Sequence, residues 1–175
     1  KINDWRVKEN STVTYSVGGL ILSNSGAITA NYWLSEIYDE EIAEAHRTAA
    51  LHLHDLSMLT GYCAGWSLKQ LIQEGLGGVA GKITSSPAGH LSTLCNQMVN
   101  FLGIMQNEWA GAQAFSSFDT YLAPFVKVDN LTQKEVKQCI QSFIYGVNTP
   151  SRWGTQAPFS NITLDWTVPA DLADQ

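Results

Sequence analysis

The chain has 175 residues, of which 45% are apolar, so it can bury the core of one domain, and a disordered or fibrous chain is excluded. Lys and Arg number 10 against 16 Asp and Glu, and the net charge of −6 with scattered basic residues argues against the basic patch of a nucleic-acid-binding or membrane-surface protein. Only 15% of the residues are charged, against about 25% in a typical soluble domain, which predicts that part of the surface is buried against further protein.

The first quarter of the chain is predicted to be a loop followed by two helices. Residues 1–25 are polar and rich in Gly and Ser, with at most one short strand at 13–17. Apolar residues at roughly helical spacing predict a helix over 27–38. Asp39 is suited to cap a second helix over 40–49, whose first turn carries two glutamates at the positive end of the helix dipole.

The next segment is predicted to contain a strand, a loop and a short helix. Apolar and polar residues alternate strictly over 51–56, which is typical of a strand. A glycine-flanked loop is expected at 61–65. Ser67 and Gln70 then have the spacing of a capping box for a helix that ends near Glu74.

A long uncharged helix is expected after a glycine-rich loop over 75–89. Apolar residues recur at intervals of three and four over 91–107. No Asp, Glu, Lys or Arg occurs in residues 83–107, although a solvent-facing helix normally carries such residues. We therefore expect this helix to be buried against protein or against a polar ligand.

Two further helices are expected in the last third of the chain. One covers 117–126 and is broken near Pro124, because proline lacks the amide hydrogen that a helix needs. The other covers 134–145, and Thr132 with Glu135 forms its capping box.

Residues 159–167 regain strand character, so the expected strands lie far apart in the sequence with helices between them. This order predicts an α/β fold with parallel or mixed strands. No internal repeat or low-complexity linker divides the chain, and a single unit over residues 1–175 is expected.

Several features favour a cytoplasmic protein. Three cysteines are an odd number and do not make a disulfide framework. The first 26 residues lack the continuous apolar region of a signal peptide. The closest approach to a membrane span, residues 91–106, is interrupted by four amide side chains, so no membrane association is expected. The chain starts without Met, and we expect it to be one piece of a longer polypeptide.

His52, His54 and Asp55 lie in the predicted strand, where residues two apart face the same side. Two converging imidazoles are compatible with a metal site, but no other Cys or His has ligand spacing, and no metal site is predicted. Two alternatives stay open. One face of the strand could line a cavity, or the histidines could be hydrogen-bonded inside the core.

Cys63 follows Tyr62 in the glycine-flanked loop, where small neighbours let a ligand approach the thiol closely. Loops that follow the strands of α/β folds often carry chemistry. No basic residue in the motif activates the thiol, so a buried, inert cysteine stays open as the alternative. Cys95 and Cys139 lie within expected helices and are predicted to be inert.

The remaining polar segments are less specific. Residues 75–81 lack the Gly-Lys-Ser/Thr ending of a P-loop and the context of a dinucleotide fingerprint. Lys82 is compatible with a phosphate contact, and a flexible connector is the alternative. Residues 107–115 and 152–159 could each line a site.

Seven strings in one order make the chain resemble the catalytic subunit of anaerobic (class III) ribonucleotide reductases, which are glycyl radical enzymes. They cover essentially the whole chain without large gaps, and their common order argues against chance. The strings are DWRVKEN at 4–10, ANYWL at 30–34, IAEAHR at 42–47, LHLHDL at 51–56, GYCAGWSL at 61–68, QAFSSFD at 113–119 and QAPFSN at 156–161.

The resemblance implies a ten-stranded α/β barrel, of which this chain would form the N-terminal part, with long interface helices. It also implies reduction of ribonucleoside triphosphates to deoxyribonucleotides. In this family an iron–sulfur, S-adenosylmethionine-dependent activase generates a glycyl radical, which oxidises a cysteine to a thiyl. The thiyl removes the ribose 3′-hydrogen, the 2′-hydroxyl leaves as water, and a second cysteine helps to supply reducing equivalents.

The resemblance also assigns residues. Cys63 matches the second cysteine. The residues expected to flank the substrate are His52, His54, Asp55, Ser57 and Tyr62. The helices over 67–74 and 91–107 resemble a dimer interface with its specificity site for deoxynucleoside triphosphates or ATP. The residues expected to bind that effector are Lys82, Asn96, Asn100 and Gln113.

The chain also departs from the family pattern. The thiyl cysteine, the glycyl radical loop, the four-cysteine zinc site and the N-terminal ATP-cone have no counterpart in it, and Ala49-Ala50 replaces a Gly-Asp type turn. We therefore expect no reductase activity from this chain alone. Formate or a thiol protein would be the reductant, and a homodimer or a second chain would complete the assembly. The alternative is a catalytically silent dimerisation or nucleotide-binding fragment.

Overall fold

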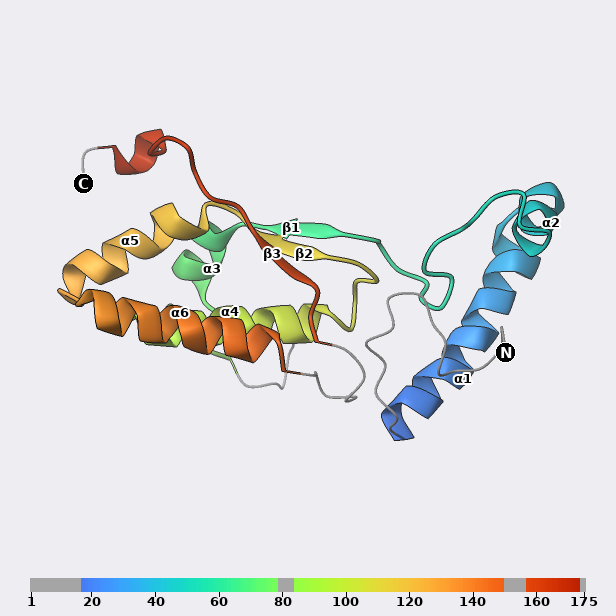
Figure 1. Ribbon diagram of the computed structural model, residues 1–175, viewed down its shortest axis with the longest axis horizontal. Coiled ribbons are helices and arrows are strands. Elements are labelled where there is room, and N and C mark those ends of the chain that lie inside the picture. The colour runs from blue at the N-terminus through green and yellow to red at the C-terminus, as the bar shows by residue number, and fades with distance from the viewer. Residues whose placement is uncertain (1–16, 79–83, 150–156, 174–175) are drawn as a thin grey trace.

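The computed structural model of the chain describes residues 17–78, 84–149 and 157–173. Figure 1 shows two parts: α1 and α2 at one end, and a small sheet with α3 to α6 at the other. The strands are β1 (Ala64–Trp66), β2 (Gln113–Phe115) and β3 (Ser160–Ile162). The helices are α1 (Val17–Tyr32), the π-helical turn η1 (Trp33–Ile37), α2 (Glu40–Arg47), α3 (Leu68–Glu74), α4 (Leu91–Met105), α5 (Phe118–Val128), α6 (Gln133–Val147) and the 3₁₀ turn η2 (Ala170–Leu172).

The three strands form one parallel sheet in the order β1-β2-β3. Gly65 pairs with Ala114, and Ala114 pairs with Asn161. The chain passes through α3 and α4 between β1 and β2, and through α5 and α6 between β2 and β3. Parallel strands need such crossovers. The predicted α/β fold with parallel strands is therefore confirmed.

The two faces of the sheet differ. Gln113 and Phe115 of β2 are almost fully buried on the face that the helices cover. On the opposite face Gly65 and Asn161 are exposed and Ala114 is half-buried. Figure 1 shows α4 and α6 on one side of the strands only. Within the described residues, one face of the sheet is thus packed and the other is bare.

The core lies between the sheet and the helices, and α4 supplies much of it. Side chains of α4 that are almost fully buried include Leu94, Met98 and Leu102, each of which contributes about 1.5–3 kcal/mol through burial. Gly146 of α6 lies directly against Val99 of α4, where an added Cβ would meet Val99 Cγ2 at 2.7 Å. The absence of a side chain at residue 146 therefore lets the two helices approach closely.

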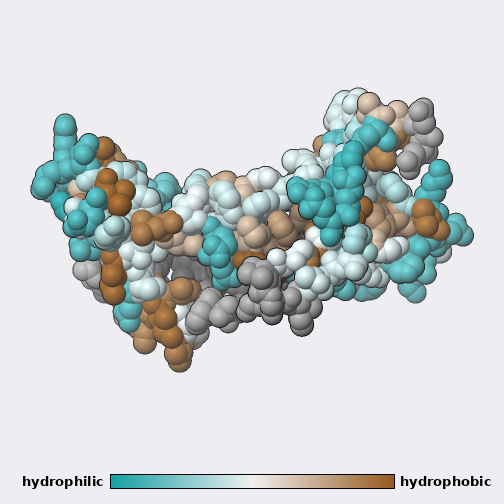
Figure 2. Space-filling view, turned by 180° about the vertical axis from the view of Figure 1, so that it is seen from behind, coloured by the Kyte–Doolittle hydropathy of each residue, from teal (hydrophilic) through white to brown (hydrophobic). Residues whose placement is uncertain are grey.

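The expected loop over 1–25 is wrong for residues 17–25, which belong to α1, while residues 1–16 lie outside the described residues. The Gly and Ser content suggested a loop. However, Leu20, Ile21 and Leu22 are apolar residues that extend the helix predicted at 27–38 towards the N-terminus. That helix is present as the end of α1 and the π-helical turn η1. α1 exposes Val17 and Ile28, and apolar residues gather over it in Figure 2.

The strand expected at 51–56 is wrong, because these residues form an irregular segment. Asp55 has a left-handed backbone, with φ of 54°, which interrupts an extended strand. The amide of Leu53 donates to Nδ1 of His46 at 3.1 Å and is not paired with a neighbouring strand. Conversely, β1 begins within the loop expected at 61–65, and β2 lies in the segment 107–115, for which no strand was predicted. Three residues are too few for alternation to become visible.

The predicted helix ends were largely right. The capping box of α6 is confirmed, with Thr132 N donating to Glu135 Oε2 at 2.8 Å and Glu135 N donating to Thr132 Oγ1 at 3.4 Å. Ser67 caps α3, but its box is only half formed, because the side chain of Gln70 donates to Glu74.

Two details of the other helices differ from prediction. Asp39 occupies the N-cap of α2 without a side-chain cap bond. Pro124 does not break α5, which runs from Phe118 to Val128 with its buried face held in the core. No helix among the described residues is both long and apolar enough to cross a membrane.

Candidate functional site

Cys63 lies at the amino end of β1, with its side chain exposed. We expected it after a strand, and the structure instead places it one residue before a strand. Successive residues of a strand point to opposite faces, so Cys63 shares its face of the sheet with Gly65. That face is the bare one. The thiol therefore borders an uncovered surface of small side chains, and the alternative of a buried cysteine is wrong.

Backbone and side-chain hydrogen bonds hold residues 60–64 against residues 108–112. Ala110 N donates to Gly61 O at 3.1 Å, Gly111 N donates to Tyr62 O at 2.5 Å, and Ala64 N donates to Ala112 O at 3.0 Å. The hydroxyl of Thr60 donates to the carbonyl of Glu108. The ladder of β1 and β2 begins at Ala64 and Gln113, so these bonds hold the two segments together beside the thiol, outside the regular ladder.

Aromatic rings support the same segment from the core. The indole of Trp109 lies over Gly61, where an added Cβ would overlap the ring. Trp66 meets Trp109 edge to face with ring centroids 5.8 Å apart, and it meets Phe101 at 5.1 Å. The loop around Cys63 is therefore connected to the packed core through a row of aromatic side chains.

Three of the five residues expected to flank the substrate lie in one row of rings. Ring centroids are 5.7 Å apart for His46 and His52, 4.7 Å for His52 and His54, and 6.3 Å for His54 and Tyr62. A Cβ atom added at Gly111 would lie 3.1 Å from Cε2 of Tyr62 and 2.8 Å from Sγ of Cys63, so the row of rings ends near the thiol. His52, His54 and Tyr62 are all exposed, which contradicts the alternative of histidines inside the core.

The other two members of that set lie beside this row. Asp55 is half-buried in a turn in which Met58 N donates to its carbonyl oxygen at 3.1 Å, and Ser57 is exposed. In the described part of the chain, no group of three or more His, Cys, Asp or Glu residues could hold a metal ion.

The residues expected to bind an effector do not share one environment. Asn96 and Asn100 are exposed on α4. Gln113 is 1% exposed, and both ends of its amide are used, since its Oε1 accepts from Trp66 Nε1 at 2.9 Å and its Nε2 donates to Leu102 O at 3.2 Å. Lys82 lies outside the described residues. The apolar face of α4 is buried as expected, whereas its amide face is open.

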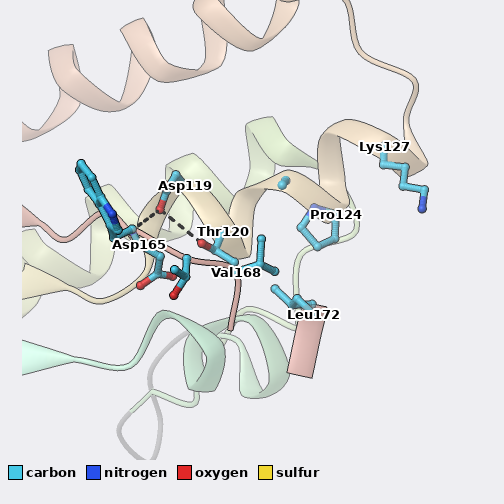
Figure 3. Close-up of a pocket in the computed structure, with 10 residues that line it drawn as sticks. Asp119, Thr120, Pro124, Lys127, Asp165, Val168 and Leu172 are labelled. Atoms are coloured by element: carbon cyan, nitrogen blue, oxygen red, sulfur yellow. Dashed lines mark hydrogen bonds between the residues drawn. The ribbon is translucent and has the colours of Figure 1, made fainter. Parts of the chain in front are cut away.

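A surface hollow of about 460 Å³ lies at the opposite, carboxyl edge of the sheet, and sequence reasoning did not find it. Figure 3 shows its lining between α5 and the segment after β3. Asp119 Oδ1 accepts from Asp165 N at 3.1 Å, and Asp165 Oδ1 accepts from Ser117 Oγ at 3.2 Å. These carboxylates tie the segment after β3 to α5, so the hollow is explained by packing of the chain on itself.

The fold first defines the class of protein. A small parallel sheet with helical crossovers on one face is an α/β arrangement and is consistent with part of an α/β barrel. The chain matches the anaerobic ribonucleoside-triphosphate reductase family over residues 9–175 and belongs to that family.

Solved structures agree with this assignment. The anaerobic ribonucleotide reductase from Thermotoga maritima in complex with dATP and CTP has 26% sequence identity and a TM-score of 0.73, over 84% of this chain and 28% of that chain. The same enzyme with citrate in the active site has 26% identity and a TM-score of 0.70, over 84% and 30%. This chain thus spans less than a third of these relatives. No curated protein matches it.

Proposed function

We propose that this chain forms part of the catalytic barrel of an anaerobic ribonucleoside-triphosphate reductase, with Cys63 as the second redox cysteine beside the ribose. The observation that carries the proposal is the exposed thiol one residue before β1, in a parallel sheet whose uncovered face carries the small residues Gly65 and Ala114. Small side chains leave room for a sugar against the strands. The net reaction replaces the C2′–OH bond by C2′–H, releases water, and takes up two electrons and two protons. A thiol protein can supply both electrons and both protons, whereas formate, oxidised to CO2, supplies two electrons and one proton, and the second proton comes from solvent.

The proposal gives the rings beside the thiol a role in binding. His52, His54 and Tyr62 present imidazole and phenol groups in one row that ends at Cys63. Such groups can donate to the oxygens of a ribonucleoside triphosphate. Asp55 and Ser57 stay part of the proposed substrate surface. In this proposal a glycyl radical, generated by an iron–sulfur, S-adenosylmethionine-dependent activase, would supply the oxidising equivalent for the thiyl chemistry, and we assign no residue of this chain to it.

The test is the formation of dCTP from CTP under anoxic conditions by a complete reductase that carries this chain. The Cys63→Ser variant is expected to abolish product formation, because serine has the shape of cysteine but cannot take part in thiol redox chemistry. Cys139→Ser, at a half-buried cysteine on α6, is the matched control and should retain activity. Unchanged dCTP formation by Cys63→Ser would remove this thiol from the mechanism.

A second candidate function is binding without catalysis, by a dimerising or nucleotide-binding fragment. It is favoured by the open face of α4, where Asn96 and Asn100 are exposed and Ile104 is 59% exposed, with no charged residue in the helix. Amide side chains can bind a base or a sugar, and an uncharged helix face can bind a second copy of the chain. Both would serve the effector-controlled homodimer that the family resemblance implies, with Lys82, Asn96 and Asn100 as the proposed effector-binding residues. Gln113 is left out of this proposed site, because its amide is buried and used inside the core.

This second candidate is tested by calorimetry with dATP and by light scattering. Asn100→Arg is expected to weaken both the binding of dATP and dimer formation, because it places a charge on the uncharged face. Lys134→Arg on α6 keeps the charge of an exposed residue and serves as the control. A monomer that shows no heat of binding would contradict this candidate function.

A further inference from the structure

We infer that Gly111 is a positioning residue for Cys63, and this inference rests on the proposed function of that thiol. Gly111 lies in the segment 108–112, which precedes β2 and is hydrogen-bonded to residues 60–64. Its backbone N–H donates to the carbonyl oxygen of Tyr62 at 2.5 Å. Gly111 is thus the residue of this segment that contacts Tyr62 and Cys63.

The approach of Gly111 to Cys63 is too close for any side chain. A Cβ atom added at Gly111 would lie 2.7 Å from the carbonyl oxygen of Tyr62, 2.8 Å from the Sγ atom of Cys63 and 3.1 Å from Cε2 of Tyr62. Carbon atoms need about 3.5 Å or more from such neighbours. Because the nearest of these atoms belongs to the backbone, rotation of a side chain cannot relieve the overlap.

Two further contacts fix the segment on both sides of Gly111. Trp109 is pressed over Gly61 in the same way, and Ala64 N donates to Ala112 O one step beyond the thiol. Residues on both sides of Gly111 are therefore already fixed, and a larger residue at 111 can be accommodated only if the chain at Tyr62 and Cys63 moves. The absence of a side chain at residue 111 therefore allows the Sγ atom of Cys63 to occupy its position beside the sheet.

The functional consequence follows from the sensitivity of radical transfer to position. A displacement of reacting groups by about 1 Å can lower a rate by about 10²-fold. Gly111 contacts Cys63, which we assign to the chemistry, and Tyr62, which is one of several residues that we assign to binding. Its replacement is therefore expected to reduce turnover more than substrate affinity.

The experiment compares Gly111→Ala, Gly89→Ala and Cys63→Ser in the complete reductase, with dCTP formation from CTP as the readout. Gly111→Ala is expected to lower kcat by about 10²-fold while the KM for CTP changes less than about threefold. Gly89→Ala is the control, since an added Cβ there meets nothing within 4 Å. A kcat of Gly111→Ala within about threefold of the unsubstituted enzyme, with Cys63→Ser inactive, overturns the positioning role alone. An active Cys63→Ser variant overturns the proposed function itself.

A thermal unfolding cycle in the full chain separates the thiol contact from general damage to the fold. Gly111→Ala is expected to lower Tm by roughly 3–10 °C, and by clearly less in a Cys63→Ala background, where the Sγ atom is gone. A Gly111→Ala chain that folds only in the Cys63→Ala background supports the inference as well. An equal loss of Tm, or a failure to fold, in both backgrounds overturns it.

Discussion

Trp66 of β1 donates its indole N–H to the side-chain oxygen of Gln113 of β2 at 2.9 Å, and this bond joins the two strands on the packed face of the sheet. The amide nitrogen of Gln113 donates in turn to the carbonyl oxygen of Leu102 on α4, at 3.2 Å. One buried glutamine therefore connects the sheet to its principal helix. The opposite face of the same strands carries the surface that we assign to the substrate.

Gln113→Leu is expected to destabilise the chain by about 1–3 kcal/mol, because it leaves the Trp66 N–H without its partner inside the core. Denaturant unfolding measures the change. Gln141→Leu, at an exposed position of α6, is the matched control and should change the stability by less than about 0.5 kcal/mol. Equal effects of the two variants would show that the buried bond contributes nothing specific.

Thr132→Ala is expected to lower the free energy of unfolding by about 1 kcal/mol, because it removes the hydroxyl that caps α6. Gln133→Ala, one residue along and exposed, has no capping role and serves as the control. A Thr132→Ala chain with the unfolding midpoint of the control would contradict the capping role.

The same cap predicts a dependence on pH. Hydrogen bonds from Thr132 hold the pKa of the exposed Glu135 carboxyl below its usual 4.5. A carboxyl with a lowered pKa stabilises the folded state above its unfolded pKa, and this contribution is lost as the pH falls through the folded pKa. Unfolding midpoints measured from about pH 6 to pH 3 should therefore fall less steeply for Thr132→Ala than for the unsubstituted chain. Parallel curves would contradict the prediction.

The three cysteines are expected to differ in reactivity. Burial raises the pKa of Cys95 to about 12, whereas Cys63 is exposed. Because the thiolate is the reactive form, iodoacetamide at pH 8 should modify Cys63 first and Cys95 only after unfolding. Peptide mass spectrometry over time measures both. Modification of Cys95 at the rate of Cys63 in the folded chain would contradict the described burial.

The features predicted correctly from sequence are those that depend on local patterns. Thr132 and Glu135 have the spacing of a capping box, and the long apolar period of α4 is visible over 15 residues. The strands β1 and β2 were missed because each has three residues, and their extended form comes from pairing with each other, not from alternation along the chain.

The geometry around the residues that we assign to the site could not be predicted from sequence. Alternation over 51–56 suggested a strand. Asp55 instead adopts a left-handed backbone, and the amide of Leu53 donates a hydrogen bond to Nδ1 of His46. Such contacts between distant residues have no signature in the local sequence. For the same reason the close approach of Gly111 to Cys63 became visible only once the strands were placed side by side.

The central claim, that Cys63 stands beside the substrate, is tested most directly by protection of its thiol. In the complete reductase under anoxic conditions, saturating CTP is expected to slow the alkylation of Cys63 by iodoacetamide by at least about tenfold, because bound ligand shields the side chain. Alkylation of Cys139 in the same sample should stay unchanged. Equal rates for Cys63 with and without CTP, under conditions where CTP is shown to bind, would contradict the claim.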